Sequence, residues 1–136
     1  MTQEELVDIL FKRAVLVLKI PRKMRDRPNL AWKPMRGRKA PINTAKSYSM
    51  AYVDIVKGVI TLDIYTPRKR QPKSLKSILR LIAHEVAHIQ KPPFRQLWKG
   101  RIITRQHYPK FYKQVNKNVK KLFKDKEINN IINQTI

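Results

Sequence analysis

The chain contains no cysteine, and this absence removes several kinds of chemistry at once. Without thiols there is no disulfide, no thiolate-ligated metal and no cysteine nucleophile. Long apolar runs are also missing, and the run at residues 14–18 is too short to cross a bilayer. The first five residues include two glutamates, where a signal peptide needs positive charge. We therefore expect an intracellular protein without a membrane partner, cytoplasmic or associated with a nucleoid or other nucleoprotein, and not secreted.

Acidic residues are scarce, with 9 Asp and Glu against 31 Lys and Arg, and the formal net charge is +22. Scattered lysines ordinarily form a solvated surface, but an excess of this size repels itself unless a polyanion lies nearby. The basic residues also cluster, and we expect the clusters to bind nucleic acid through its phosphates. An anionic membrane surface is the lesser alternative. The candidate nucleic-acid-binding residues are Arg22, Lys23, Arg36, Arg38, Lys39, Arg68, Lys69 and Arg70.

Histidine is rare as well, with three in the chain, and two of them flank a glutamate in His84-Glu85-Val86-Ala87-His88. This is the HExxH pattern of zinc-dependent peptidases. A spacing of four on a helix brings two imidazoles to one face, close enough to hold a single Zn²⁺ ion. The glutamate between them can take a proton from the attacking water and return one to the leaving amine. We therefore expect His84 and His88 to be metal ligands and Glu85 to be the catalytic base.

The segment around this motif predicts a helix from Ser74, a good N-cap, to about Gln90, where a Pro-Pro pair follows. His88 falls about 40° from His84 around the helix axis, whereas the apolar residues fall between about 120° and 220°. Those apolar residues are Leu75, Ile78, Leu79, Ile82, Val86 and Ile89. A histidine on the apolar stripe would more often be a core residue. This pair lies on a separate face, which favours metal ligation.

The remaining histidine, His107, is the candidate for a third ligand. It immediately precedes a predicted helix, so a short loop can bring it back to the ion; the alternative is a surface loop residue. A site of three histidines leaves one coordination position open for water, as catalysis requires. Arg105, Tyr108 and Tyr112 flank His107 and are candidate donors to the oxyanion or substrate. The alternatives are that Tyr112 belongs to the core and that Arg105 is surface charge.

The N-terminal half predicts a helix followed by a small sheet. A capping box at Thr2 and Glu5 starts a helix of about residues 2–19. Residues 30–32 predict a short strand. Residues 48–56 and 59–65 flank a Lys57-Gly58 turn and predict a hairpin, and 59–65 alternates as a half-buried strand does.

The C-terminal half predicts a loop and helices. Residues 91–107 form the loop, and a helix begins near Tyr108 with Pro109 in its first position. The tail continues as an amphipathic helix. We expect its isoleucines to cover the domain; the lesser alternative is that they meet a partner. The chain is therefore a single α+β domain over residues 1–136, with a core of about 2–123 and a helical tail of 124–136.

The motif and its surroundings resemble a known family. Ile82-Ala83-His84-Glu85-Val86-Ala87-His88-Ile89, followed by His107-Tyr108-Pro109-Lys110-Phe111, looks like the SprT-like, WLM and YgjP-like minimal zinc metallopeptidases. Those proteins carry HExxH on a helix, then a third histidine followed four residues on by an aromatic residue. The similarity covers roughly residues 2–123. It implies a zincin-like minimal domain with an N-terminal helix, a small antiparallel or mixed sheet, an HExxH helix and a C-terminal helix.

The resemblance also implies a site and a setting for it. His84, His88 and His107 would bind one Zn²⁺ per chain, and Glu85 would be the catalytic base. The SprT-like and WLM branches include proteases that act on proteins crosslinked to DNA. Gln106 stands where the family often has a glycine, and the zinc ribbon of many SprT-like proteins is missing because there is no cysteine. The basic surface would therefore have to bind DNA itself.

Two functions follow as hypotheses. The first is a zinc metallopeptidase that hydrolyses peptide bonds in nucleic-acid-associated proteins, with a protein or peptide as substrate and nucleic acid as partner. The alternative is a non-enzymatic nucleic-acid-binding or packaging protein, or part of a nucleoprotein particle, in which zinc is structural. Glu85 weighs against the alternative, because a structural site needs no base.

Overall fold

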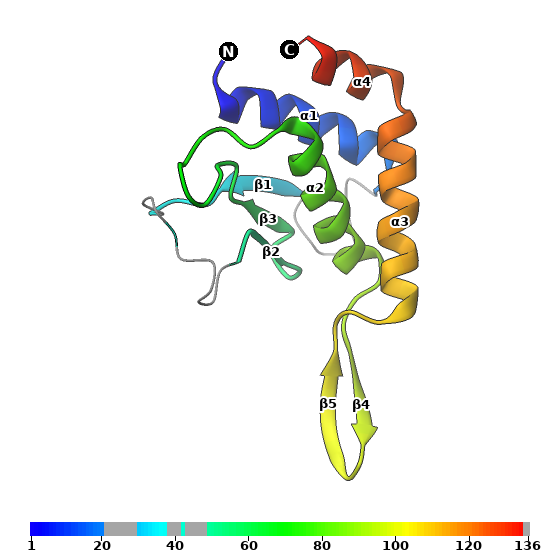
Figure 1. Cartoon of the computed structure of the whole chain (residues 1–136). Helices are drawn as coiled ribbons and strands as arrows, with labels where there is room; N and C mark the ends of the chain where they lie inside the picture. Colours follow the sequence, from blue (N-terminus) through cyan, green and yellow to red (C-terminus); the bar gives the residue numbers. More distant parts are fainter. Residues whose placement is uncertain (21–29, 38–41, 43–48, 135–136) are drawn as a thin grey trace.

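The structure is a computed structural model that describes residues 1–20, 30–37, 42 and 49–134. These residues form an α+β domain with four helices and two small sheets (Figure 1). The helices are α1 (Gln3–Val17), α2 (Leu75–Gln90), α3 (Pro109–Lys124) and α4 (Lys126–Asn133). The strands are β1 (Ala31–Pro34), β2 (Ala51–Asp54), β3 (Val59–Leu62), β4 (Phe94–Trp98) and β5 (Arg101–Arg105). Within the described ranges, no helix is long and apolar enough to cross a membrane.

Helix α1 begins as its capping pattern predicts. The Thr2 hydroxyl accepts a hydrogen bond from the backbone N–H of Glu5 at 3.1 Å. The helix ends at Val17, two residues before the predicted end, and Lys19 then takes a left-handed φ of 53°. One face of α1 packs against α2, and its buried residues are Val7, Leu10, Phe11 and Ala14.

The three-stranded sheet has the order β1-β3-β2, with β1 parallel and β2 antiparallel to the central strand. The predicted strand near residues 30–32 is confirmed as β1, and the predicted hairpin is confirmed as β2 and β3. The turn between Asp54 and Val59 has four residues rather than two. It is closed by a 2.8 Å hydrogen bond from the Gly58 N–H to the Asp54 carbonyl, and Gly58 takes a left-handed φ of 68°.

The half-buried pattern predicted for residues 59–65 is wrong on one face. The apolar positions are buried as predicted, but Thr61 and Asp63 are also buried, at 2% and 0% exposure. Asp63 is buried together with a charged partner: its two carboxylate oxygens each accept a 2.9 Å hydrogen bond from the Arg70 guanidinium. A carboxylate can be buried when such a pair replaces its hydration. The loop after β3 therefore folds back over the strand.

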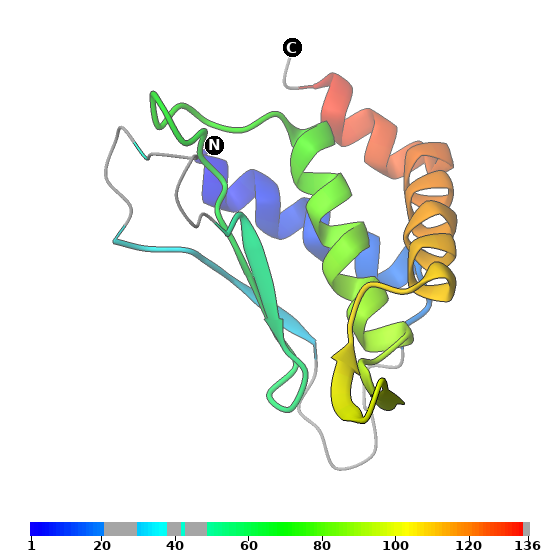
Figure 2. The same ribbon diagram turned by 60° about the horizontal axis from the view of Figure 1, so that its bottom comes forward.

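Helix α2 lies between the sheet and α3 (Figure 2). It begins after the predicted N-cap Ser74, whose hydroxyl accepts a 3.2 Å hydrogen bond from the Ser77 N–H, and it ends at the predicted Gln90. The predicted apolar stripe is buried throughout, and consists of Leu75, Ile78, Leu79, Ile82, Val86 and Ile89. This stripe is the centre of the hydrophobic core, so the orientation of α2 is fixed by packing on the side away from its histidines.

The tail is a helix, as predicted, and its isoleucines cover the domain. Asp125 accepts a 3.1 Å hydrogen bond from the Ile128 N–H as the N-cap of α4, and forms a 2.9 Å ion pair with Arg13 of α1. Ile128 and Ile132 are 0% and 7% exposed within the same core as α1. The core therefore extends beyond the predicted limit at residue 123.

The segment 91–107 differs from its prediction. Instead of a loop, it contains the β4–β5 hairpin, with five paired residues in each strand. Lys99 and Gly100 form its turn, and both have left-handed φ angles, of 49° and 76°. Two successive left-handed residues are the geometry of the tight turns that match the twist of paired strands. Figure 1 shows this hairpin extending away from the helices and the other sheet.

Candidate metal centre

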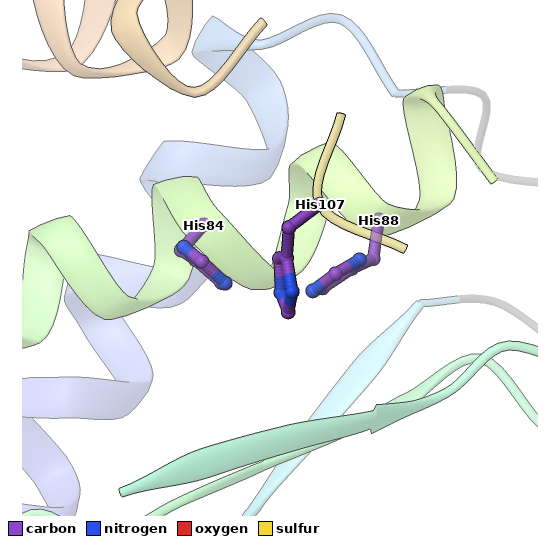
Figure 3. A group of neighbouring side chains, drawn as sticks. All are labelled: His84, His88 and His107. Atoms are coloured by element: carbon purple, nitrogen blue, oxygen red, sulfur yellow. The ribbon is translucent and has the colours of Figure 1, made fainter. Parts of the chain in front are cut away.

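The three histidines of the chain converge on one point. Figure 3 shows His84, His88 and His107 with their rings gathered beside α2. One nitrogen from each ring can be chosen so that all three lie within 4.8 Å of one another. This separation allows three imidazoles to reach a single ion, so the group could hold a metal. The predicted grouping of His107 with the two motif histidines is present.

The buried stripe of α2 accounts for the placement of the first two candidate ligands. Because that stripe faces the core, His84 and His88 face the opposite side, one turn apart, with ring centres separated by 5.1 Å. His88 is buried and His84 is half-buried. The pair is thus held by a packed helix, which fixes the backbone under both side chains.

Phe111 supports all three imidazoles from the start of α3. Its ring centre lies 4.4 Å from that of His88, nearly parallel to it, and 5.1 Å from those of His84 and His107. The phenylalanine is fully buried. An apolar ring in this position restricts the histidine rotamers without competing for a metal, because it carries no donor atom.

The connection to His107 is tied down by Tyr108. This residue is the N-cap position of α3, and Pro109 occupies the first turn as predicted. The Tyr108 hydroxyl donates a 3.0 Å hydrogen bond to the Pro92 carbonyl, and its ring lies 5.0 Å from that of Phe94. Both contacts join the chain entering the β4–β5 hairpin to the chain leaving it. His107 is therefore returned to α2 although a hairpin intervenes.

Burial shifts the titration of the groups around this point. Burial raises the pKa of the Glu85 carboxyl to about 7. Burial, followed by the charges of His84 and His107, lowers the pKa of His88 to about 4. The pKa of His84 is lowered as well, by burial and then by His107. His84 and His88 are therefore neutral at physiological pH, which is the form that binds a metal.

A hollow of about 330 Å³ opens beside the three histidines. It is lined by the motif residues and by strand β2, including Tyr52 and Val53, and by Pro93 and Gln106 from the roots of the hairpin. A second hollow of about 620 Å³ also reaches His84 and Glu85. Its other walls come from β2, α2 and α3, with Leu81, Val115 and Val119 among them. Both hollows therefore have His84 and Glu85 in their walls.

The strand beside the site is β2, an outer strand of the sheet. In this sheet β3 lies between β1 and β2, so the edge strand beside the site is β2 and not β3. Tyr52 and Gln106 line the hollow but were not predicted as site residues. No local pattern marks them, because their position depends on how β2 and the hairpin roots meet α2.

The three candidate oxyanion donors lie in different settings. The Arg105 guanidinium donates a 3.0 Å hydrogen bond to Gln96 and lies 5.3 Å from the Trp98 ring centre, along the hairpin. The Tyr108 hydroxyl bonds to a backbone carbonyl, as described above. Tyr112 is 52% exposed, so it is not a core residue, and its ring stacks at 6.1 Å on His107. Of the three, Tyr112 is the one whose ring stacks on a candidate ligand.

The candidate nucleic-acid-binding residues divide into three groups. Arg68 and Lys69 are exposed, and Arg36 is exposed with a 3.2 Å ion pair to Glu4. Arg70 is largely enclosed, with a 16% exposed side chain that pairs with Asp63. The candidates that lie outside the described residues are Arg22, Lys23, Arg38 and Lys39.

The geometry of three convergent imidazoles with a buried glutamate between two of them can hold a metal and position one proton acceptor. Comparisons with models of known families, with curated proteins and with solved structures find no match to this chain.

Proposed function

We propose that this chain is a zinc-dependent metallopeptidase that hydrolyses peptide bonds in nucleic-acid-associated proteins. The observation that carries the proposal is the convergence of His84, His88 and His107 within 4.8 Å, with Glu85 buried beside them at the border of a hollow. A structural metal site has no use for a carboxylate in that position, whereas hydrolysis requires a proton acceptor there.

The donor set fits zinc. Three imidazoles, with no thiolate in the chain, are a known ligand set for catalytic Zn²⁺ and leave one coordination position open. When bound, the ion supplies Lewis-acid polarisation and lowers the pKa of water at the site. The chain's part is to hold the ligands in place, through the packing of α2 and the Phe111 ring that contacts all three histidines.

Glu85 serves as the proton acceptor and later as the proton donor. In the metal-free protein burial raises its pKa to about 7, so its carboxylate takes up a proton more readily than a solvated one does. It would take a proton from the attacking water and deliver one to the nitrogen of the leaving amine. Burial at 6% exposure limits its contact with bulk water. Removal of a general base of this kind typically slows a reaction by about 10²- to 10⁴-fold.

An extended peptide would lie beside β2. This strand pairs with β3 on one side and lines the hollow at the histidines on the other. An extended chain can add to such a strand through backbone hydrogen bonds, which gives affinity without demanding a particular sequence. The two hollows that flank Glu85 would then receive side chains on either side of the scissile bond.

The net charge of +22 directs the enzyme to its substrates. Sequence-independent attraction to phosphates concentrates a basic protein on nucleic acid. Proteins already bound there would then be the accessible substrates. The same charge favours the second candidate, a nucleic-acid-binding or packaging protein with structural zinc, and the position of Glu85 argues against it.

The test compares the wild type with Glu85→Gln. Zinc content is measured by mass spectrometry, and cleavage of a histone is measured with and without single-stranded DNA. We expect one zinc per chain in both proteins, cleavage by the wild type that DNA increases, and a loss of cleavage of at least about 10²-fold in the variant. His84→Ala serves as the control that loses zinc as well as cleavage.

Equal cleavage by Glu85→Gln and the wild type would refute the catalytic role. If neither protein cleaves while both retain zinc and bind DNA, the second candidate is correct.

A further inference from the structure

The β4–β5 hairpin, residues 94–105, is an arm that projects from the domain (Figures 1 and 2). Every residue of β4 is exposed, and so are three of the five residues of β5. A hairpin that contributes to a core buries one of its faces, but this one exposes both. Its continuous strand pairing, with a tight turn at Lys99 and Gly100, keeps the arm extended.

Three large apolar side chains gather at the tip of the arm. Leu97 and Ile102 are paired across the strands and are 73% and 72% exposed. Trp98, on the opposite face of the ribbon, is 50% exposed. The tip therefore exposes an apolar pair on one face and an aromatic ring on the other.

The arm is also strongly basic. It has no acidic residue, and its cations are Arg95, Lys99, Arg101 and Arg105. Two of them lie against the indole, with the Arg105 guanidinium 5.3 Å and the Lys99 ammonium 5.8 Å from the Trp98 ring centre. Cations placed around an exposed aromatic ring are arranged for a ligand that offers both flat rings and negative charge.

We propose that the arm binds single-stranded nucleic acid, with unpaired bases stacking on Trp98 and phosphates contacting Lys99 and Arg101. Base stacking on an aromatic side chain and neutralisation of the backbone are the two components of single-strand binding. The bases of a duplex are stacked on one another and present only their edges in the grooves. The Trp98 ring offers a surface for the flat face of a base, which a duplex does not expose, so single strands fit it better.

The inference deepens the proposed function, since it rests on the association with nucleic acid, and it does not depend on peptide hydrolysis. The roots of the arm carry two residues of the site hollow, Pro93 and Gln106. A strand of five residues is about 17 Å long, so a nucleic acid held at the tip lies within that reach of the metal centre. The arm would bring a strand, and the protein attached to it, to the hollow.

The decisive experiment compares two strands that differ only in their bases. A fluorescein-labelled oligothymidylate of about 16 nucleotides and an abasic strand of the same length carry the same phosphates. Binding is followed by anisotropy in the Glu85→Gln background, so that no proteolysis interferes. We expect Trp98→Ala to weaken oligothymidylate binding by about 5- to 100-fold and to leave abasic-strand binding unchanged.

A matched pair of charge variants tests the phosphate contacts. Arg101→Gln lies on the arm, and Lys57→Gln lies in the exposed turn between β2 and β3. Each removes one positive charge. Arg101→Gln should reduce the salt dependence of binding to both strands, by about 0.7 in the logarithmic slope, and Lys57→Gln should not. Equal effects of the two variants would mean that the charge acts from anywhere on the surface, which overturns the assignment to the arm.

Tryptophan fluorescence gives an independent readout. The chain has two tryptophans, and the Trp32 indole is engaged with Asp8 through a 3.1 Å hydrogen bond. In a Trp32→Phe protein, Trp98 is the sole reporter, and oligothymidylate but not the abasic strand should quench its emission. Circular dichroism of each variant checks that the fold is retained.

Other outcomes overturn the inference. If Trp98→Ala weakens the binding of both strands equally, or of neither, bases do not stack on Trp98. The wider association with nucleic acid still stands if the variant binds both strands. If vesicles containing phosphatidylserine bind through Trp98 and oligothymidylate does not, the tip is a membrane contact instead. Failure of the peptidase test leaves each of these measurements interpretable, because none requires cleavage.

Discussion

The buried carboxyl of Glu85 gives the sharpest quantitative prediction. Its pKa is raised from 4.5 to about 7 by burial in the folded, metal-free protein. A raised pKa for an acid means that the folded state holds a proton that the unfolded state has released. The associated stability is fully present below about pH 4.5 and is lost as the pH rises through about 7. Replacing the glutamate by neutral glutamine removes this loss.

The magnitude follows from the two pKa values. At about 1.36 kcal/mol per pH unit, their difference corresponds to about 3 kcal/mol at high pH. We therefore expect Glu85→Gln to be more stable than the wild type by about 3 kcal/mol near pH 8.5 and by less than about 1 kcal/mol near pH 5. Because the pKa values of His84 and His88 are lowered, both histidines are neutral at pH 8.5 in either protein, so the difference there reports on Glu85.

The assay is urea unfolding of both proteins with a chelator present, at the two pH values. Glu5→Gln, at an exposed position of α1, makes the same chemical change without burial and should not reproduce the pH dependence. A stability difference that is the same at both pH values would refute the reasoning. It would mean that the Glu85 carboxylate is solvated in the folded protein, and its role as a tuned base would lose its physical support.

Three further predictions concern packing and the metal. Asp63→Asn should destabilise the fold by about 3–5 kcal/mol, measured by urea unfolding, because it leaves the Arg70 guanidinium enclosed without its charged partner. Phe111→Ala should lower the free energy of unfolding by about 3–5 kcal/mol in the same assay, because the ring is fully buried. It should also weaken zinc binding in a competition with a chelator. An unchanged zinc affinity would mean that the ring does not position the histidines. His107→Ala should weaken zinc binding, measured by calorimetry. Because the His107 side chain is exposed, the substitution should change the free energy of unfolding of the metal-free protein by less than about 1 kcal/mol. An unchanged zinc affinity would exclude His107 as a ligand.

The motif helix could be predicted in full because its signals are local. Ser74 caps it, a Pro-Pro pair follows it, and the apolar residues repeat with the helical period between those limits. The same period separates the histidines from the buried stripe, so their common face followed from the sequence alone. His107 was harder, because its return to α2 depends on Tyr108 and Pro92 meeting across a hairpin.

The arm was not predicted, because it does not contact the core. Hydrophobic periodicity reports which residues face a buried surface, and strands exposed on both faces show no such period. The remaining signal was the turn. Lys99-Gly100 has the same sequence as Lys57-Gly58, which correctly predicted the other hairpin. The burial of Asp63 also escaped prediction, because it depends on Arg70 reaching back from a loop.

The paired strands of the arm also change what it costs to assemble the metal centre. A metal held by His88 and His107 closes a loop, and the entropy of closure grows with the number of free residues in it. Because Phe94 is already paired with Arg105, the twelve residues of the arm add nothing to that number. Only the few residues at the roots of the hairpin count as free residues between His88 and His107. We therefore expect that the arm can lengthen or shorten by whole strand pairs while the three histidines keep the same arrangement.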